Sequence, residues 1–159
     1  MRSGGRVLHG GNGGNQVAER ILLIEDEPNI TEAISFVLKR AGMDVITHAN
    51  GTGALEVIAR VRPDVLVLDV MLPGESGYEI LRALRADPAT RALPVLMLTA
   101  RGQDKDRDLA RQLGATRFMT KPFSNTEVLE TVRALAAEAA VADGDGDGGK
   151  NGGNGSAPP

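Results

Sequence analysis

The chain has 159 residues, of which 42% are hydrophobic and 25% are charged, as in an ordinary soluble domain. The absence of cysteine excludes disulfides, thiolate zinc sites and thiol catalysis, and the net charge of −3 argues against a broad basic surface for nucleic acid. No apolar run approaches the roughly 20 residues of a membrane span, so we expect no membrane insertion and a cytoplasmic location.

The two ends of the chain differ in composition from its middle. Residues 1–18 begin with a glycine- and asparagine-rich stretch, and residues 143–159 read DGDGDGGKNGGNGSAPP. Such segments cannot recover the entropy lost on ordering, so we expect both to be flexible and the folded domain to cover residues 19–142. The tail imitates the start of a calcium loop, but Asn154 stands where a bidentate glutamate is needed, which favours disorder.

Short aliphatic runs alternate with stretches of helical spacing along the predicted domain. The predicted strands are residues 21–24, 45–47, 65–68, 95–98 and, more weakly, 117–120. The predicted helices are residues 30–38, 54–61, 78–85 and 104–113, and a last one that begins after Ser124. Ser124 and Glu127 have the spacing of a capping box at the start of that helix.

Regular alternation of strand and helix predicts a parallel sheet with helices on both faces. Ligands bind such sheets at the carboxyl ends of the strands, near the switch in strand order. The residues at those ends are Glu25, Asp26 and Glu27 after the first strand, Asp69 after the third, Thr99 after the fourth and Lys121 after the fifth.

These residue types, gathered at one edge, indicate a place where phosphate is handled. Two carboxylates about 4 Å apart repel by roughly 4 kcal/mol at an effective dielectric constant of 20, and a divalent cation would relieve this. Oxygen ligands without a nearby histidine or cysteine favour Mg²⁺ over zinc. Lys121 offers a cation and Thr99 a hydroxyl donor, and Asp69, on a central strand, is the best candidate for a nucleophile that forms an aspartyl phosphate.

In these residues the chain resembles the receiver domain of two-component response regulators. The matching stretches are ILLIEDEPNI, VLVLDVMLPGESGYEIL, LPVLMLTA and GATRFMTKPF, in the order and spacing of the family, over about residues 20–140. The resemblance implies a flavodoxin-like (βα)5 fold, a doubly wound parallel sheet of five strands in the order 2-1-3-4-5. It also implies a signalling protein, not a dedicated enzyme, that assists its own phosphorylation and dephosphorylation.

The resemblance implies that Asp69 accepts a phosphoryl group from the phosphohistidine of a histidine kinase or a histidine phosphotransfer protein. It implies a bound Mg²⁺, which Mn²⁺ can replace. The metal ligands carried over by position are Glu25, Asp26, Asp69 and the backbone carbonyl of Met71.

The resemblance also implies a switch that responds to the phosphoryl group. Lys121 would pair with the phosphoryl oxygens and precede a cis peptide bond to Pro122, and Thr99 would move towards the same group. Phe118 would fill the space that Thr99 leaves. The surface formed by the fourth helix, the fifth strand and the fifth helix would then change and control a downstream protein partner.

The chain departs from the transcription-factor branch of the family at its dimer positions. That branch commonly ties its active dimer with acidic residues before the switch aromatic and an arginine in the last helix. Here those positions hold Thr116, Arg117 and Thr131, so we expect a monomer or a weak dimer. Because the tail follows Ala142, we also expect a stand-alone receiver that binds no DNA directly and acts on a separate partner.

Three alternatives share parts of this pattern. A flavodoxin needs hydroxyl and glycine donors after the first strand, where EDEPN would repel a phosphate. A haloacid-dehalogenase-type phosphatase needs a second aspartate two residues after the nucleophile, and that position is Met71. A binding module that keeps the fold without being phosphorylated stays open, because intact residues do not guarantee a kinase.

Overall fold

The computed structural model describes residues 17–100 and 104–149, with side chains up to Val141. The strands are β1 (Arg20–Ile24), β2 (Asp44–His48), β3 (Val65–Asp69), β4 (Val95–Thr99) and β5 (Arg117–Thr120). The helices are α1 (Pro28–Arg40), α2 (Ala54–Val61), α3 (Gly77–Ala86), α4 (Asp104–Leu113) and α5 (Asn125–Gly149). All strand pairs are parallel in the order β2-β1-β3-β4-β5, which confirms the predicted flavodoxin-like fold.

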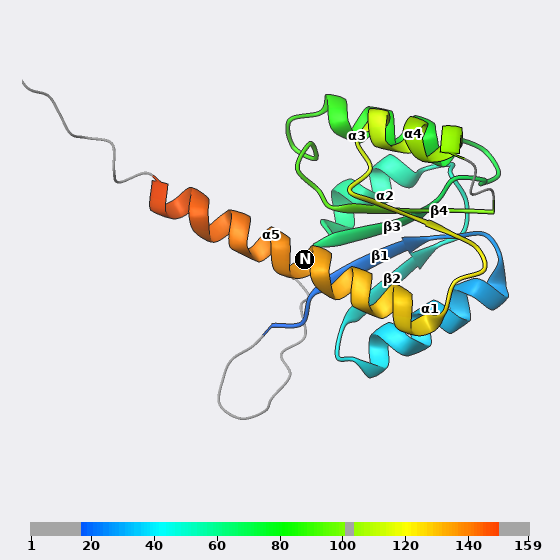
Figure 1. Ribbon diagram of the computed structural model, residues 1–159, viewed down its shortest axis with the longest axis horizontal. Helices are drawn as coiled ribbons and strands as arrows, with labels where there is room; N and C mark the ends of the chain where they lie inside the picture. The colour runs from blue at the N-terminus through cyan, green and yellow to red at the C-terminus, as the bar shows by residue number, and fades with distance from the viewer. Residues whose placement is uncertain (1–16, 101–103, 150–159) are drawn as a thin grey trace, which may run out of the picture.

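The helices form a layer on each face of the sheet. Helices α1 and α5 cover one face, and α2, α3 and α4 cover the other (Figure 1). Successive side chains of a strand point to opposite faces, so Ile21 and Leu23 of β1 pack under α1 and α5 while Leu22 and Ile24 pack under the second layer. Strands β1, β3 and β4 are therefore aliphatic on both faces, as is usual for the inner strands of a parallel sheet.

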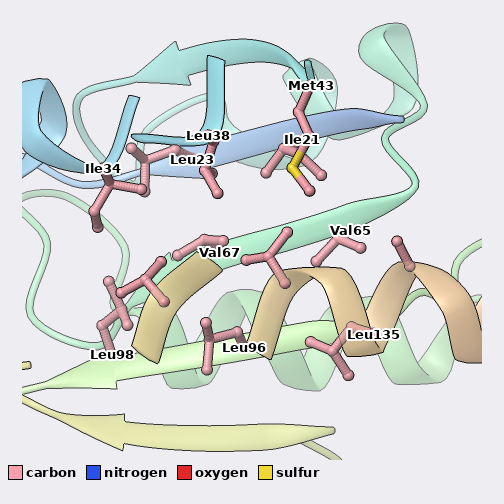
Figure 2. Close-up of a cluster of buried hydrophobic side chains, with 13 residues drawn as sticks. Ile21, Leu23, Ile34, Leu38, Met43, Val65, Val67, Leu96, Leu98 and Leu135 are labelled. Carbon is pink, nitrogen blue, oxygen red and sulfur yellow. The ribbon is translucent and has the colours of Figure 1, made fainter. Parts of the chain in front are cut away.

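The core between the sheet and α1 and α5 is built from branched aliphatic side chains. Figure 2 shows Val65 and Val67 of β3, Leu96 and Leu98 of β4 and Leu135 of α5 in one cluster of buried side chains. All five residues are fully buried. This packing fixes the inner strands rigidly and so fixes the residues at their ends.

Two serine caps mark where helices begin. In α3 the Ser76 hydroxyl accepts from the Glu79 backbone N–H at 3.3 Å while the Glu79 carboxylate accepts from the Ser76 N–H at 3.4 Å. The corresponding distances for Ser124 and Glu127 before α5 are 3.0 Å and 2.9 Å, which confirms the predicted capping box. Each box satisfies two backbone donors that the first helical turn leaves unpaired.

Two described segments reach beyond residues 19–142, the predicted extent of the domain. Ala18 is buried, with 6% of its surface exposed, although the flexible N-terminal segment was expected to include it; residues 1–16 lie outside the described part. Helix α5 continues past Ala142 to Gly149, so the helix enters the segment 143–159 that composition predicts to be flexible. Residues 150–159 lie outside the described part.

Within residues 17–100 and 104–149, no helix combines the length and the apolar composition that a bilayer crossing requires.

Candidate functional site

The carboxyl ends of four neighbouring strands meet at one edge of the sheet. Strand β3 ends on Asp69 and β4 ends on Thr99, while Glu25 follows β1 and Lys121 follows β5. The strand order places β3 between β1 and β4, so Asp69 lies between the acids after β1 and the hydroxyl at the end of β4. The strand order switches between β1 and β3, because the chain goes from β1 to β2 on one side and then to β3 on the other. Asp69 lies at this switch point, where ligands bind in such sheets.

Three carboxylates gather at this edge. Glu25, Asp26 and Asp69 each offer an oxygen, and these oxygens lie within 4.8 Å of one another. Glu25 is 2% exposed and Asp69 1% exposed, whereas Asp26 is open to solvent. At the upper separation, two full charges repel by about 3 kcal/mol at an effective dielectric constant of 20.

Lys121 provides the positive charge that this cluster needs. Its ammonium nitrogen lies 3.3 Å from Oε1 of Glu25 and 3.4 Å from Oδ2 of Asp69, and a third carboxylate, Glu27, lies 3.8 Å away. The lysine backbone N–H donates to the Thr99 carbonyl at 2.7 Å, and the peptide bond between Lys121 and Pro122 is cis. One ammonium therefore balances two buried carboxylates only in part.

The pKa values reflect this imbalance. Burial raises the pKa of Glu25 to about 7, against the hydrogen bond from the Glu27 N–H and the charge of Lys121, and Asp69 adds repulsion. Burial also raises the pKa of Asp69, opposed by Lys121. Burial acts to lower the pKa of Lys121, but the charges of Asp69 and Glu25 outweigh it and the pKa is raised. The lysine stays charged, and without a cation burial favours the protonated form of the Glu25 carboxyl more than is usual for a glutamate.

The backbone around Asp69 holds its side chain in place. The Met71 N–H donates to Oδ1 of Asp69 at 3.4 Å, and the Gly77 N–H donates to the Val70 carbonyl at 2.9 Å. A side chain on Gly77 would collide with the Asp69 carbonyl, so only glycine lets α3 begin this close to the end of β3. The Met71 side chain itself is 62% exposed beside the site.

The two predicted switch residues lie on neighbouring strands. Thr99 is 3% exposed at the end of β4. Phe118 of β5 lies opposite Met97 of β4 and packs, half-buried, against the core under α2, α3 and α4. The Arg107 guanidinium of α4 lies 5.8 Å from the centre of the Phe118 ring, within the range of a cation–π contact.

Sequence reasoning missed two contributions to the site. It did not predict the ion pair between Glu27 and Lys121, although Glu27 belongs to the acidic triplet EDE. The path of the chain from β1 into α1 brings this third carboxylate towards the lysine. It also passed over Gly77, whose signal was the PGESG stretch between β3 and α3. Both depend on how closely two elements approach, which spacing alone does not give.

The donor set of the acidic cluster fits a hard divalent cation. Its three ligand side chains are all carboxylates, and neither histidine nor cysteine belongs to it among the described residues. Mg²⁺ prefers such oxygen ligands, needs few of them from the protein, and leaves room for water and phosphate oxygens. The repulsion within the cluster would fall on metal binding.

Comparison with known proteins points to one family. The family model for the response regulator receiver domain matches residues 21–133. The phosphate regulon transcriptional regulatory protein PhoB of Escherichia coli (strain K12) is 39% identical over 119 residues, 75% of this chain and 52% of PhoB. The alkaline phosphatase synthesis transcriptional regulatory protein PhoP of Bacillus subtilis is 40% identical over 124 residues, 78% of this chain and 51% of PhoP. The chain spans about half the length of these curated relatives.

Solved structures agree with the sequence comparison. The chemotaxis response regulator CheY4 of Vibrio cholerae superposes with a TM-score of 0.70 at 30% identity, covering 74% of this chain and 98% of CheY4. The BeF3-activated receiver domain of RstA from Klebsiella pneumoniae gives a TM-score of 0.68 at 32% identity, covering 74% and 97%. Together with the fold and the acidic edge of the sheet, these matches show that the chain belongs to the response regulator receiver domain family, a signalling module of two-component systems.

Proposed function

We propose that Asp69 is the phosphoacceptor of this receiver domain. The observation that carries the proposal is its position: a carboxylate with 1% exposure, held at a central strand end, 3.4 Å from the Lys121 ammonium and within the acidic cluster. A buried carboxylate that neighbouring carboxylates repel lowers the stability of the domain. A role in phosphoryl transfer explains why an acid stands at this position.

The metal of this proposal is Mg²⁺, which Mn²⁺ can replace. Glu25, Asp26 and Asp69 would hold it, with the backbone carbonyl of Met71 as a further ligand. When bound, the ion supplies positive charge that neutralises the oxygens of the transferred phosphoryl group. The same site then suits a phosphate-bearing donor, which it would otherwise repel.

The chain's own residues account for the transfer. A carboxylate oxygen of Asp69 forms a bond to phosphorus as the bond between phosphorus and the donor histidine nitrogen breaks, and the bonding pair leaves with the imidazole. Lys121, already 3.4 Å from Asp69, stabilises the charge on the phosphoryl oxygens. The hydrogen bond from the Met71 N–H to Oδ1 fixes the orientation of the Asp69 carboxylate, so the side chain needs little reorganisation before transfer.

The signal is proposed to pass through Thr99 and Phe118. A phosphoryl group adds nearly two negative charges and new acceptor oxygens, which favour a Thr99 hydroxyl turned towards them. The half-buried Phe118 ring could then move inward and change its contact with Arg107 on α4. This shifts the population of a surface formed by α4, β5 and α5 towards an active arrangement.

The donor is proposed to be a histidine kinase or a histidine phosphotransfer protein, and the reader of the α4–β5–α5 surface a downstream protein. Because such kinases take their phosphate from ATP, we place this exchange in the cytoplasm. Thr116, Arg117 and Thr131 support a monomer or weak dimer, since Arg117 pairs within the chain, at 2.6 Å, with Glu138 of α5.

The test is an intact-mass measurement after incubation with Mg²⁺ and acetyl phosphate, with Asp69→Asn as the matched control. We expect a labile phosphoryl adduct in the wild type and none in the variant. Binding of beryllofluoride, a non-covalent phosphoryl analogue, checks for an acyl phosphate that is lost too quickly to detect. If the wild type shows neither adduct nor beryllofluoride binding, the domain is a binding module that works without phosphorylation.

A further inference from the structure

Glu27 stands apart from the acids that form the candidate metal cluster. The cluster within 4.8 Å consists, among the described residues, of Glu25, Asp26 and Asp69, and Glu27 is not part of it. Its carboxylate instead lies 3.8 Å from the Lys121 ammonium, and its side chain is 59% exposed. Lys121 therefore has two buried carboxylate partners and one that faces solvent.

Among the described residues, Lys121 is the ion-pair partner of the Glu27 side chain, which does not cap the helix that follows it. Glu27 occupies the N-cap position of α1, but its side chain makes no capping hydrogen bond. Its backbone carbonyl accepts from the N–H groups of Ile30 and Thr31 at 3.1 Å and 3.0 Å, and its N–H donates to Glu25 at 3.1 Å. The backbone of Glu27 thus makes the hydrogen bonds at the start of α1, and its carboxylate pairs with Lys121.

The three partners of Lys121 differ in how easily they can be displaced. Glu25 and Asp69 are buried, and separating either from the lysine would leave a charge without compensation in a poorly solvated place. Glu27 can return to water, because an exposed ion pair contributes little. Of the three carboxylates, Glu27 is therefore the one whose separation from Lys121 costs least.

We propose that Glu27 is a positioning residue that competes with incoming phosphoryl oxygens for the Lys121 ammonium and opposes anionic donors and phosphoryl analogues until it is displaced. The proposal rests on the function assigned to Asp69 above. Glu27 acts through Lys121 and through its own negative charge, and both effects make binding of a phosphoryl group less favourable. A small anionic donor meets this opposition directly.

The test compares wild type, Glu27→Gln and Glu32→Gln at saturating Mg²⁺. Glu32 is an exposed acid on α1, so its variant removes the same charge without touching the lysine. Calorimetry measures beryllofluoride affinity, and an intact-mass time course measures the rate of adduct formation from acetyl phosphate. We expect Glu27→Gln to bind the analogue about threefold tighter and to react faster by a similar factor, with Glu32→Gln like the wild type.

Salt and stability separate this role from a merely structural one. At about 0.5 M NaCl the affinity and rate of Glu27→Gln, each divided by the wild-type value, should fall towards one, because salt screens an exposed charge. The unfolding midpoint of Glu27→Gln should equal that of the wild type. Equal affinities and rates for wild type and Glu27→Gln at low salt would overturn the proposal, as would an equal gain in Glu32→Gln. If the wild type itself neither binds beryllofluoride nor forms the adduct, the phosphoacceptor assignment fails instead.

Discussion

Burial shifts the pKa values of the two inner carboxyls of this site. Glu25 and Asp69 lie almost wholly out of water beside one lysine, and the pKa values of both carboxyls are raised. Two buried acids placed so close lower the stability of the domain, and the cluster that they form with Asp26 could hold a metal ion. Single substitutions there should therefore separate stability from function.

Replacing Asp26 by asparagine should show this separation. The change removes one negative charge from the cluster, so the metal-free domain should become more stable, by about 1 kcal/mol, while the Kd for Mg²⁺ rises. Urea unfolding in EDTA measures the first effect and a Mg²⁺ titration the second. Glu32→Gln serves as the control, and an unchanged or lower stability of Asp26→Asn without metal would contradict repulsion within the cluster.

The pH dependence of stability follows from the raised pKa of Glu25. The folded carboxyl has a pKa of about 7 and the reference value is 4.5, so between these limits the folded state binds more protons than the unfolded state. Stability in EDTA should then fall as pH rises from about 5 to 7, by at most about 3 kcal/mol, and Asp69 acts in the same direction.

Urea unfolding at several pH values checks this expectation. Added Mg²⁺ should stabilise the domain more at pH 8 than at pH 5, because the ligands must be deprotonated to bind it. Glu25→Gln should flatten the metal-free profile. A wild-type stability that stays level or increases from pH 5 to pH 7 in EDTA would be inconsistent with a protonated Glu25.

At the scale of elements, the beginnings of the helices position the residues that face the site. Helix α1 begins directly after the acidic triplet, α3 begins against the end of β3 at Gly77, and α5 begins after the Ser124 cap that follows Lys121 and Pro122. Each start is fixed by local hydrogen bonds. The connections that lead into α1, α3 and α5 are therefore held in place where each helix begins.

Ser124→Ala should destabilise the domain by about 1 kcal/mol, because it removes the acceptor for the Glu127 N–H. Ser124→Asp keeps an acceptor at the same place and should stay near the wild type. Chemical unfolding of the three proteins measures the difference. If Ser124→Ala and Ser124→Asp are equally stable, the capping box contributes nothing measurable to α5.

At the scale of the whole molecule, stability comes from the two layers that cover the sheet. Helix α5 contacts the core through Val128, Val132, Leu135 and Ala136. All four precede residue 142, and Figure 1 shows the last part of α5 leading away from the sheet. The packed domain therefore needs α5 only over its first half.

Deleting residues 143–159 should leave the free energy of unfolding within about 0.5 kcal/mol of the full chain. The helical residues 143–149 are rich in glycine and aspartate, which add little to helix stability. Thermal and urea unfolding of the truncated and full chains provide the measurement. A loss well above 1 kcal/mol would show that the segment packs against the domain.

Much of the fold followed from local pattern. Aliphatic runs such as 65–68 and 95–98 have few alternatives to buried strands, and regular alternation with helices restricts their connection to a parallel sheet. The family resemblance supplied the strand order, and the pairing of β1 with both β2 and β3 confirms it. Element ends differ slightly from the prediction: β3 and β4 each extend one residue, to Asp69 and Thr99, and α5 extends to Gly149, beyond the predicted domain end at residue 142.

The sequence by itself determined which chemical groups stand at the strand ends, because the order of residues along a buried strand and its exit is local information. Only the tertiary structure decided how those groups meet. The 3.8 Å approach of Glu27 to Lys121 depends on the angle at which α1 leaves β1. Likewise, Arg85 of α3 donates to the Gly114 carbonyl at 2.9 Å across 29 residues. Contacts between distant segments arise from the packing of whole elements, which no short stretch of sequence encodes.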